Sequence, residues 1–134
     1  MPAAGYTGTM LEPLRQRARN ALHNEAGATL STTGSGGIQA GYFPCEADGL
    51  TLYLLVPASS DVLFNLETES SVVVTTPRWQ LEGEGRVRCL SDAPPSLDLA
   101  RSSRAAGCVL VAISGRRIHL NWAAAWGFQE TIDL

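Results

Sequence analysis

The residues best placed to hold a ligand lie in one turn, Pro57-Ala58-Ser59-Ser60, between an apolar run and a short amphipathic segment. A turn that leads into a helix leaves backbone N–H groups unpaired, and serine hydroxyls add further donors for a phosphate. The first residues of the expected helix are Asp61 and Val62, and neither attracts an anion. The turn is therefore a ligand cradle, a cradle that has lost its ligand, or only a turn.

Histidines and carboxylates are the other candidates for chemistry. His119 alternates with apolar neighbours, so it faces away from them, as an interface residue would. His23 comes late in the first expected helix, where a cation suits the dipole. Glu82 and Glu84 lie ~7 Å apart on one strand face, near the spacing of paired carboxylates but more typical of a solvated face. We assign no metal site and no catalytic residue.

Composition bounds the class of protein. The chain has 134 residues, of which 45% are apolar and 17% charged, which predicts one domain over 1–134, with residues 1–8 flexible. A net charge of −3 gives no reason to expect nucleic acid or an anionic membrane as a partner. All ten basic residues are arginine, which excludes Schiff-base chemistry on a lysine.

The cysteines indicate the compartment. Cys45, Cys89 and Cys108 are odd in number and widely spaced, without a CxxC pair, which is typical of free thiols in a reducing cytoplasm. The opening "MPAAGYTGTM" lacks the basic and apolar regions of a signal peptide, and no apolar run approaches the ~20 residues that span a bilayer. We therefore expect a cytoplasmic protein.

Hydrophobic periodicity and turn signals predict the elements. A helix over about 10–24 begins at the capping box of Thr9 and Glu12. A short helix is expected over about 60–68, and residues 93–107 are expected to form a turn and a short helix that starts near Pro95 or Ser96. Strands are expected over 28–33, 38–43, 50–56, 71–76 and 79–90, followed by 108–113 and 116–122 as a hairpin across Ser114-Gly115. The apolar tail from Ala123 is expected to dock on the protein.

Two of these strands define the architecture. Residues 50–56 form a continuous apolar run, which indicates a strand covered on both faces. Residues 79–90 alternate: one face carries Trp79, Leu81, Gly83, Gly85, Val87 and Cys89, and the other is polar. The inward glycines suggest a bend. The pattern predicts a mainly β fold, a six-stranded antiparallel barrel with helical covers.

The order of these segments resembles the pyridoxamine 5′-phosphate oxidase-like family of FMN-binding split barrels. The resemblance covers about residues 10–125 and rests on an ordered series of motifs after the first helix: "GATLSTTGSGG", "DGLTLYLLV", "SSDVLFNLETESSVVV" and "WQLEGEGRV". It implies a split barrel that forms a homodimer, with a flavin at the interface and its phosphate near the turn before the second helix.

Laid on the family pattern, Ser60 matches the serine of the phosphate site and Asn65-Leu66 matches its "NL". The basic pair that members commonly carry falls on Asp61 and Val62, and Val56 stands where many have Thr or Ser. The resemblance thus marks the turn as the family's cradle by position, without its usual phosphate chemistry.

Other residues are candidate substitutes for the missing pair. Ser59 and Ser60 keep their hydroxyls, and Arg78, Arg116 and Arg117 are candidate cations that are otherwise solvated. Trp79, Trp122 and Trp126 either stack on a flavin or fill the core and the interface. The predicted cofactor-binding set is Val56, Ser59, Ser60, Asn65, Arg78 and Trp79.

Two hypotheses follow from the resemblance and its departures. The first is an FMN-dependent oxidoreductase whose flavin carries the redox step. The second is a split barrel without flavin redox activity, either a ligand-binding or interaction protein or a haem-binding relative. The haem reading follows from the resemblance, since some split barrels bind or degrade haem, and His119 is its candidate ligand. Whether the chain is an enzyme stays open, as do its substrate, its electron donor and the replacement of FMN by a deazaflavin.

Overall fold

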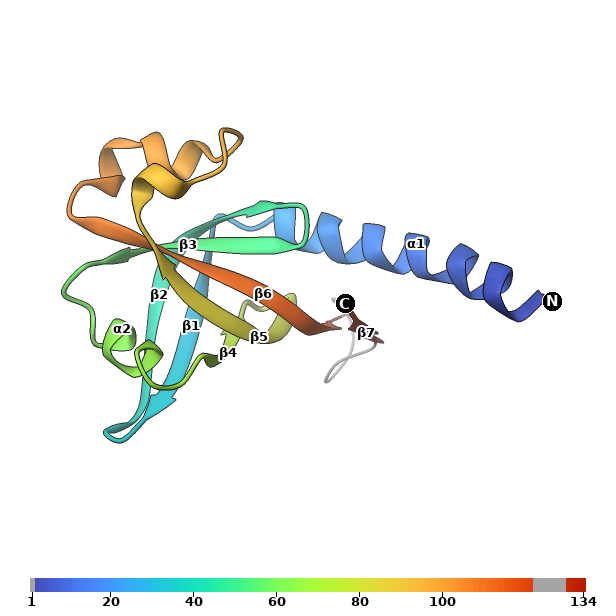
Figure 1. The fold of residues 1–134 in the computed structure, drawn as a ribbon, viewed down its shortest axis with the longest axis horizontal. Helices are drawn as coiled ribbons and strands as arrows, with labels where there is room; N and C mark the ends of the chain where they lie inside the picture. Colours follow the sequence, from blue (N-terminus) through green and yellow to red (C-terminus); the bar gives the residue numbers. More distant parts are fainter. Residues whose placement is uncertain (1, 122–129) are drawn as a thin grey trace.

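A computed structural model describes residues 2–121 and 130–134 (Figure 1). The helices are α1 (Pro2–His23) and α2 (Asp61–Leu66), and the 3₁₀ turns are η1 (Leu90–Asp92), η2 (Asp98–Arg101) and η3 (Ser103–Ala105). The strands are β1 (Gly27–Gly34), β2 (Gly37–Asp48), β3 (Thr51–Pro57), β4 (Ser71–Thr75), β5 (Trp79–Arg88), β6 (Cys108–Leu120) and β7 (Glu130–Asp133).

The strands form one antiparallel sheet that closes on itself. Their order is β3-β2-β1-β4-β5-β6-β7, and an additional pairing of β3 with β6 joins the two sides. Strands β1 to β6 thus make a closed six-stranded barrel, which confirms the predicted fold class. The tail docks as expected where it is described: β7 pairs with β6, and Ile132 is buried in the core. Trp122 and Trp126 lie outside the described residues.

The predicted two-sided burial of the third strand is confirmed. Inside the barrel, Leu52, Leu54 and Val56 belong to the main core. On the outside, Leu55 packs with Leu110 and with residues of the 3₁₀ segment that follows β5. Residues 93–107, predicted as a turn and a short helix, contain two short 3₁₀ turns, and the leucines of this segment cover this part of β3 and β6.

Helix α1 begins at Pro2, well before the predicted start near residue 10. The Thr9-to-Glu12 pattern therefore does not cap the helix, and Pro13 lies inside it without an N–H to donate to the preceding turn. Contact with the barrel holds the other end of α1. Ala18 and Leu22 are fully buried, and the indole N–H of Trp79 donates to the Ala21 carbonyl at 3.2 Å, one of the carbonyls that a helix end leaves unpaired.

The predicted hairpin across Ser114-Gly115 is wrong, because β6 is one continuous strand. The glycine marks a bulge: Glu82 pairs with Arg117 whereas Gly83 pairs with Gly115, so Arg116 is an extra residue on β6. The backbones meet closely there, since a Cβ on Gly83 would lie 2.3 Å from the Ser114 carbonyl oxygen. The bend expected from Gly83 and Gly85 is thus found at Gly83, and its partner across the bulge is Gly115 on β6.

Two other strands depart from their predicted patterns. The alternation of β5 holds from Trp79 to Gly85, after which Val87 is exposed rather than inward. Strand β2 continues to Asp48, beyond the predicted end at 43, and its outward residues Ile38 and Tyr42 are exposed. No helix in the described part of the chain is long and apolar enough to span a membrane.

We predict that Gly83→Ala destabilises the barrel, because the added methyl meets backbone that cannot move without breaking the β5–β6 pairing. The expected loss is about 1–3 kcal/mol in the free energy of unfolding, measured by urea denaturation. Gly36→Ala is the matched control, since a Cβ there meets nothing within 4 Å. Equal stability of the two variants would contradict this account of the bulge.

Candidate functional site

The turn between β3 and α2 uses two of its backbone donors within the protein. Val56, at the end of β3, is fully buried, and Ser59 is exposed. The Ala58 N–H donates to the Gly107 carbonyl at 3.0 Å, and the Ser60 N–H donates to the Pro57 carbonyl at 2.9 Å. Ser60 is the N-cap of α2 and makes no side-chain cap hydrogen bond. Two of the backbone N–H groups that the turn could offer to a phosphate therefore already have acceptors.

The charge at this turn is unfavourable for a phosphate. Asp61 is exposed at the start of α2, whereas Val62 points into the core and is only 2% exposed. Residues 24–77, which include β1 to β4 and α2, contain six acidic residues and no Lys, Arg or His. Within one chain, a cation for this turn would have to come from another part of the fold.

Asn65 holds the barrel together rather than facing a ligand. Its side chain is buried, and its amide N–H groups donate to Thr32 Oγ1 at 3.2 Å and to the Gly37 carbonyl at 3.4 Å. Gly34 makes room for it, because a Cβ at that position would lie 2.1 Å from Asn65 Oδ1. The asparagine thus clamps α2 onto the turn between β1 and β2.

Arg78 and Trp79 do not join the other predicted site residues in one chain. They lie at the start of β5, whereas Leu66 of α2 approaches Gly85 near its other end. At ~3.4 Å per residue, these positions are ~20 Å apart. Trp79 is 1% exposed and fills the core, and Arg78 is exposed and lies 4.0 Å from a Glu25 carboxylate oxygen.

His119 connects three strands. Its Nε2 lies 2.6 Å from Glu82 Oε2 on β5, and its Nδ1 lies 2.9 Å from Thr131 Oγ1 on β7. Arg117, beside it on β6, forms an ion pair with Asp133 at 2.8 Å, and this contact raises the pKa of the arginine. With both ring nitrogens engaged, this histidine secures β7 against the barrel.

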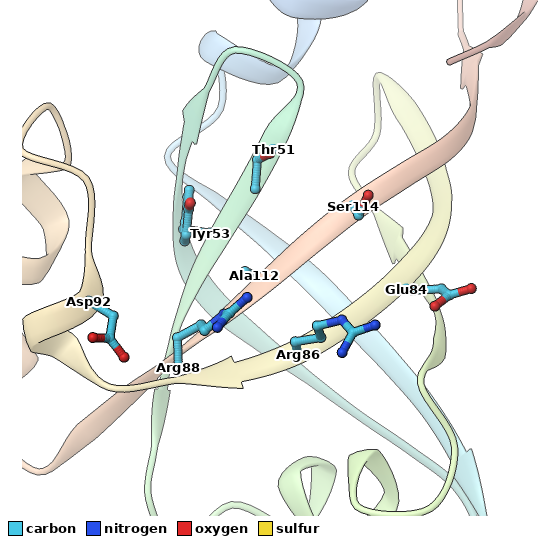
Figure 2. A pocket seen from close by; sticks show the side chains of 8 residues that line it. All are labelled: Thr51, Tyr53, Glu84, Arg86, Arg88, Asp92, Ala112 and Ser114. Atoms are coloured by element: carbon cyan, nitrogen blue, oxygen red, sulfur yellow. The ribbon is translucent and has the colours of Figure 1, made fainter.

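The outside of the barrel carries a hollow that the sequence analysis did not identify (Figure 2). Two cross-strand rows build it. Tyr53 on β3 faces Ala112 on β6, which faces Arg86 on β5, and Thr51, Ser114 and Glu84 form the next row. Because the residues of the middle strand are small, a trough of about 360 Å³ is left between the side chains of β3 and β5, with Arg88 and Asp92 at one end.

The cysteines offer no activated thiol at the core. Burial, and secondly the charge of Glu25, raise the pKa of Cys45 to about 11, so its thiol is protonated at neutral pH. Cys89 is exposed, and all three cysteines are free. The described residues hold no group of three or more His, Cys, Asp or Glu side chains that could bind a metal ion.

We predict a pH dependence of stability from Cys45. A raised pKa favours the folded state below the ordinary thiol value near 9, and this contribution is lost as pH rises towards 11. Between pH 8 and pH 11 the parent should therefore lose ~2 kcal/mol more unfolding free energy than a Cys45→Ala variant. Urea denaturation at both pH values measures this, and equal losses in the two proteins would contradict it.

Comparison with known proteins identifies the fold. No family model and no curated protein matches the sequence. The solved structures similar to it include general stress protein 26 from Bacillus anthracis str. Sterne, with a TM-score of 0.66, 15% identity and coverage of 90% of this chain and 98% of that one. A related protein from Clostridium acetobutylicum, described as of the pyridoxinephosphate oxidase family, has a TM-score of 0.63, 10% identity and coverage of 92% and 94%.

A haem binding protein from Mycobacterium smegmatis is also similar, with a TM-score of 0.64, 14% identity and coverage of 90% of this chain and 57% of that one. Such low identities establish the fold and not the activity. The chain therefore shares the split-barrel fold of pyridoxamine 5′-phosphate oxidase-like proteins, as the sequence resemblance indicated.

Proposed function

We propose that this protein is a homodimeric, ligand-binding split barrel that does not hold FMN through the turn before α2. The observation that carries the proposal is the pair Asp61 and Val62, a carboxylate at the helix start and a side chain buried in the core. A cytoplasmic location remains our prediction, supported by the free cysteines.

The residues at the turn do not fit a flavin phosphate. Losing a charge-assisted hydrogen bond costs the phosphate about 1.5–3 kcal/mol. Repulsion by Asp61 would add about 4 kcal/mol if the charges were ~4 Å apart at an effective dielectric of ~20. Asp61 instead complements the dipole of α2, and the N–H groups of Ala58 and Ser60 already have acceptors. An FMN-dependent oxidoreductase would need its phosphate contacts from elsewhere.

The haem alternative has weaker support from the geometry. His119 is the candidate ligand, but a bond to iron would require one of its ring nitrogens to leave Glu82 or Thr131. The described haem binding of the Mycobacterium smegmatis protein keeps this alternative worth testing. A visible spectrum after incubation with haemin, compared between the parent and His119→Ala, tests it directly.

Dimerisation is supported by the exposed apolar face of β2. Ile38 is 74% exposed and Tyr42 is 72% exposed, and a hollow of about 370 Å³ lies beside Ile38 over β1, β4 and β5. The exposed face of an antiparallel sheet is normally polar, and contiguous apolar surface marks an interaction site. We infer that a second copy covers it.

Asp61→Arg tests the absence of the phosphate site. The parent should bind FMN no tighter than about 100 µM, and the variant should gain about tenfold or more, because a repulsive charge becomes an attractive one. Fluorescence titration of FMN measures both affinities. Glu67→Arg, on the exposed C-terminal side of the same helix, is the charge-matched control. Tight binding by the parent, unchanged in Asp61→Arg, would overturn the proposal. Lysine at position 62 is avoided because it would bury a charge.

Ile38→Glu tests the dimer. A carboxylate in the apolar face should convert the dimer to a monomer, as measured by light scattering after size exclusion. Val87→Glu is the control, since Val87 is also exposed and apolar but lies on β5 away from this face. A monomeric parent, or a variant that remains dimeric, would show that this face does not join two copies.

A further inference from the structure

The trough outside the barrel is defined by three paired strands. Its floor is the middle strand, β6, which contributes Ala112 and Ser114. The 3₁₀ segment covers Leu55 and Leu110 and leaves the next two rows open. Figure 2 shows Tyr53 on one side of this floor and Arg86 and Arg88 on the other. Adjacent strands are ~4.8 Å apart, so ~10 Å separates the backbones of the two walls.

The two arginines of the trough are available to a ligand. They stand two residues apart on β5, both exposed and on the same face, so their Cα atoms are ~7 Å apart. Neither makes an ion pair in the described part of the chain, whereas Arg17, Arg78, Arg101 and Arg117 each do. Two guanidinium groups that line one hollow and form no ion pair with the described residues are suited to bind a carboxylate or a phosphate.

The other walls narrow the class of ligand. Tyr53 is half-buried, packed at its base against the outer apolar cluster, and offers an aromatic surface opposite Arg86. Such a surface favours a flat ring between the two walls. Glu84 and Asp92 line the trough along with the arginines, and they would repel the further charges of a polyanion. A single anionic group is therefore the best match.

We propose that this trough binds a flat aromatic molecule that carries one anionic group, with Arg86 and Arg88 on the anion and Tyr53 against the ring. This inference rests on the proposed function, namely on the statement that the protein binds a ligand, and adds the place and the chemical class of that ligand. It also agrees with the distribution of charge, because residues 24–77 contain no basic side chain and β5 and β6 carry four of the ten arginines.

Calorimetric titration of the full chain with phenyl phosphate, benzoate, inorganic phosphate and phenol tests the trough. Phenyl phosphate or benzoate should bind below about 1 mM, and inorganic phosphate and phenol at least tenfold more weakly, because each lacks half of the recognised chemistry. Whichever of the first two binds more tightly identifies the anion. No measurable binding of either up to about 10 mM would overturn the proposal.

Substitutions locate the bound molecule. Arg86→Gln and Arg88→Gln should each weaken binding about tenfold, and the double variant should abolish it. Arg15→Gln with Arg104→Gln is the matched control, because it removes the same charge from exposed positions outside the trough. Tyr53→Leu should weaken phenyl phosphate and leave inorganic phosphate unchanged. Equal losses in both double variants would show general charge attraction and overturn the proposal.

An FMN titration of the same variants separates this inference from the proposed function. FMN bound tightly by the parent and unaffected by the Arg86 and Arg88 variants would overturn the proposed function alone. Failure of all small aromatic anions, with FMN also unbound, would overturn the trough and leave the absence of a flavin site standing.

Discussion

The closure of the barrel by β6 is the constraint on which the rest of the structure depends. From Leu110 to Ser114 this strand is paired on both sides, with β5 and with β3, and its far end carries β7. Ala112 and Ser114 are small outward residues on this doubly paired strand, so the same strand that closes the core also leaves the trough outside it. The bulge at Arg116 then bends β6 towards the tail and brings His119 between β5 and β7.

The separation of charge along the chain determines where an anion can bind. The half of the barrel that contains the α2 turn has carboxylates and no basic side chain, whereas β5 and β6 carry Arg86, Arg88, Arg116 and Arg117. Long-range attraction therefore directs an anionic ligand to the β5–β6 side of the protein. The α2 turn, which the sequence resemblance marked as the expected phosphate site, therefore lies away from this favourable charge.

Periodicity and turn signals were sufficient to predict the closed barrel, because each strand has one buried face or two. The burial predicted from the apolar run of β3 and from the alternation in β5 as far as Gly85 is confirmed by the structure. Predictions from local sequence were wrong where contacts between distant strands determined the conformation. Ser114-Gly115 has the composition of a turn, but the close approach to Gly83 makes it a bulge. Asparagine and tryptophan are residue types that can contact a cofactor, yet Asn65 and Trp79 are both buried in the core. The trough could not be predicted because its rows depend on the register between strands distant in sequence.

The most direct test of the account is a crystal structure of the protein soaked with phenyl phosphate. We predict density in the trough, with phosphate oxygens within hydrogen-bond distance of Arg86 and Arg88 and the ring beside Tyr53, and none at the turn before α2. Density at Ser59 and Ser60 with an empty trough would contradict both the lost phosphate site and the assignment of binding to the face formed by β3, β6 and β5.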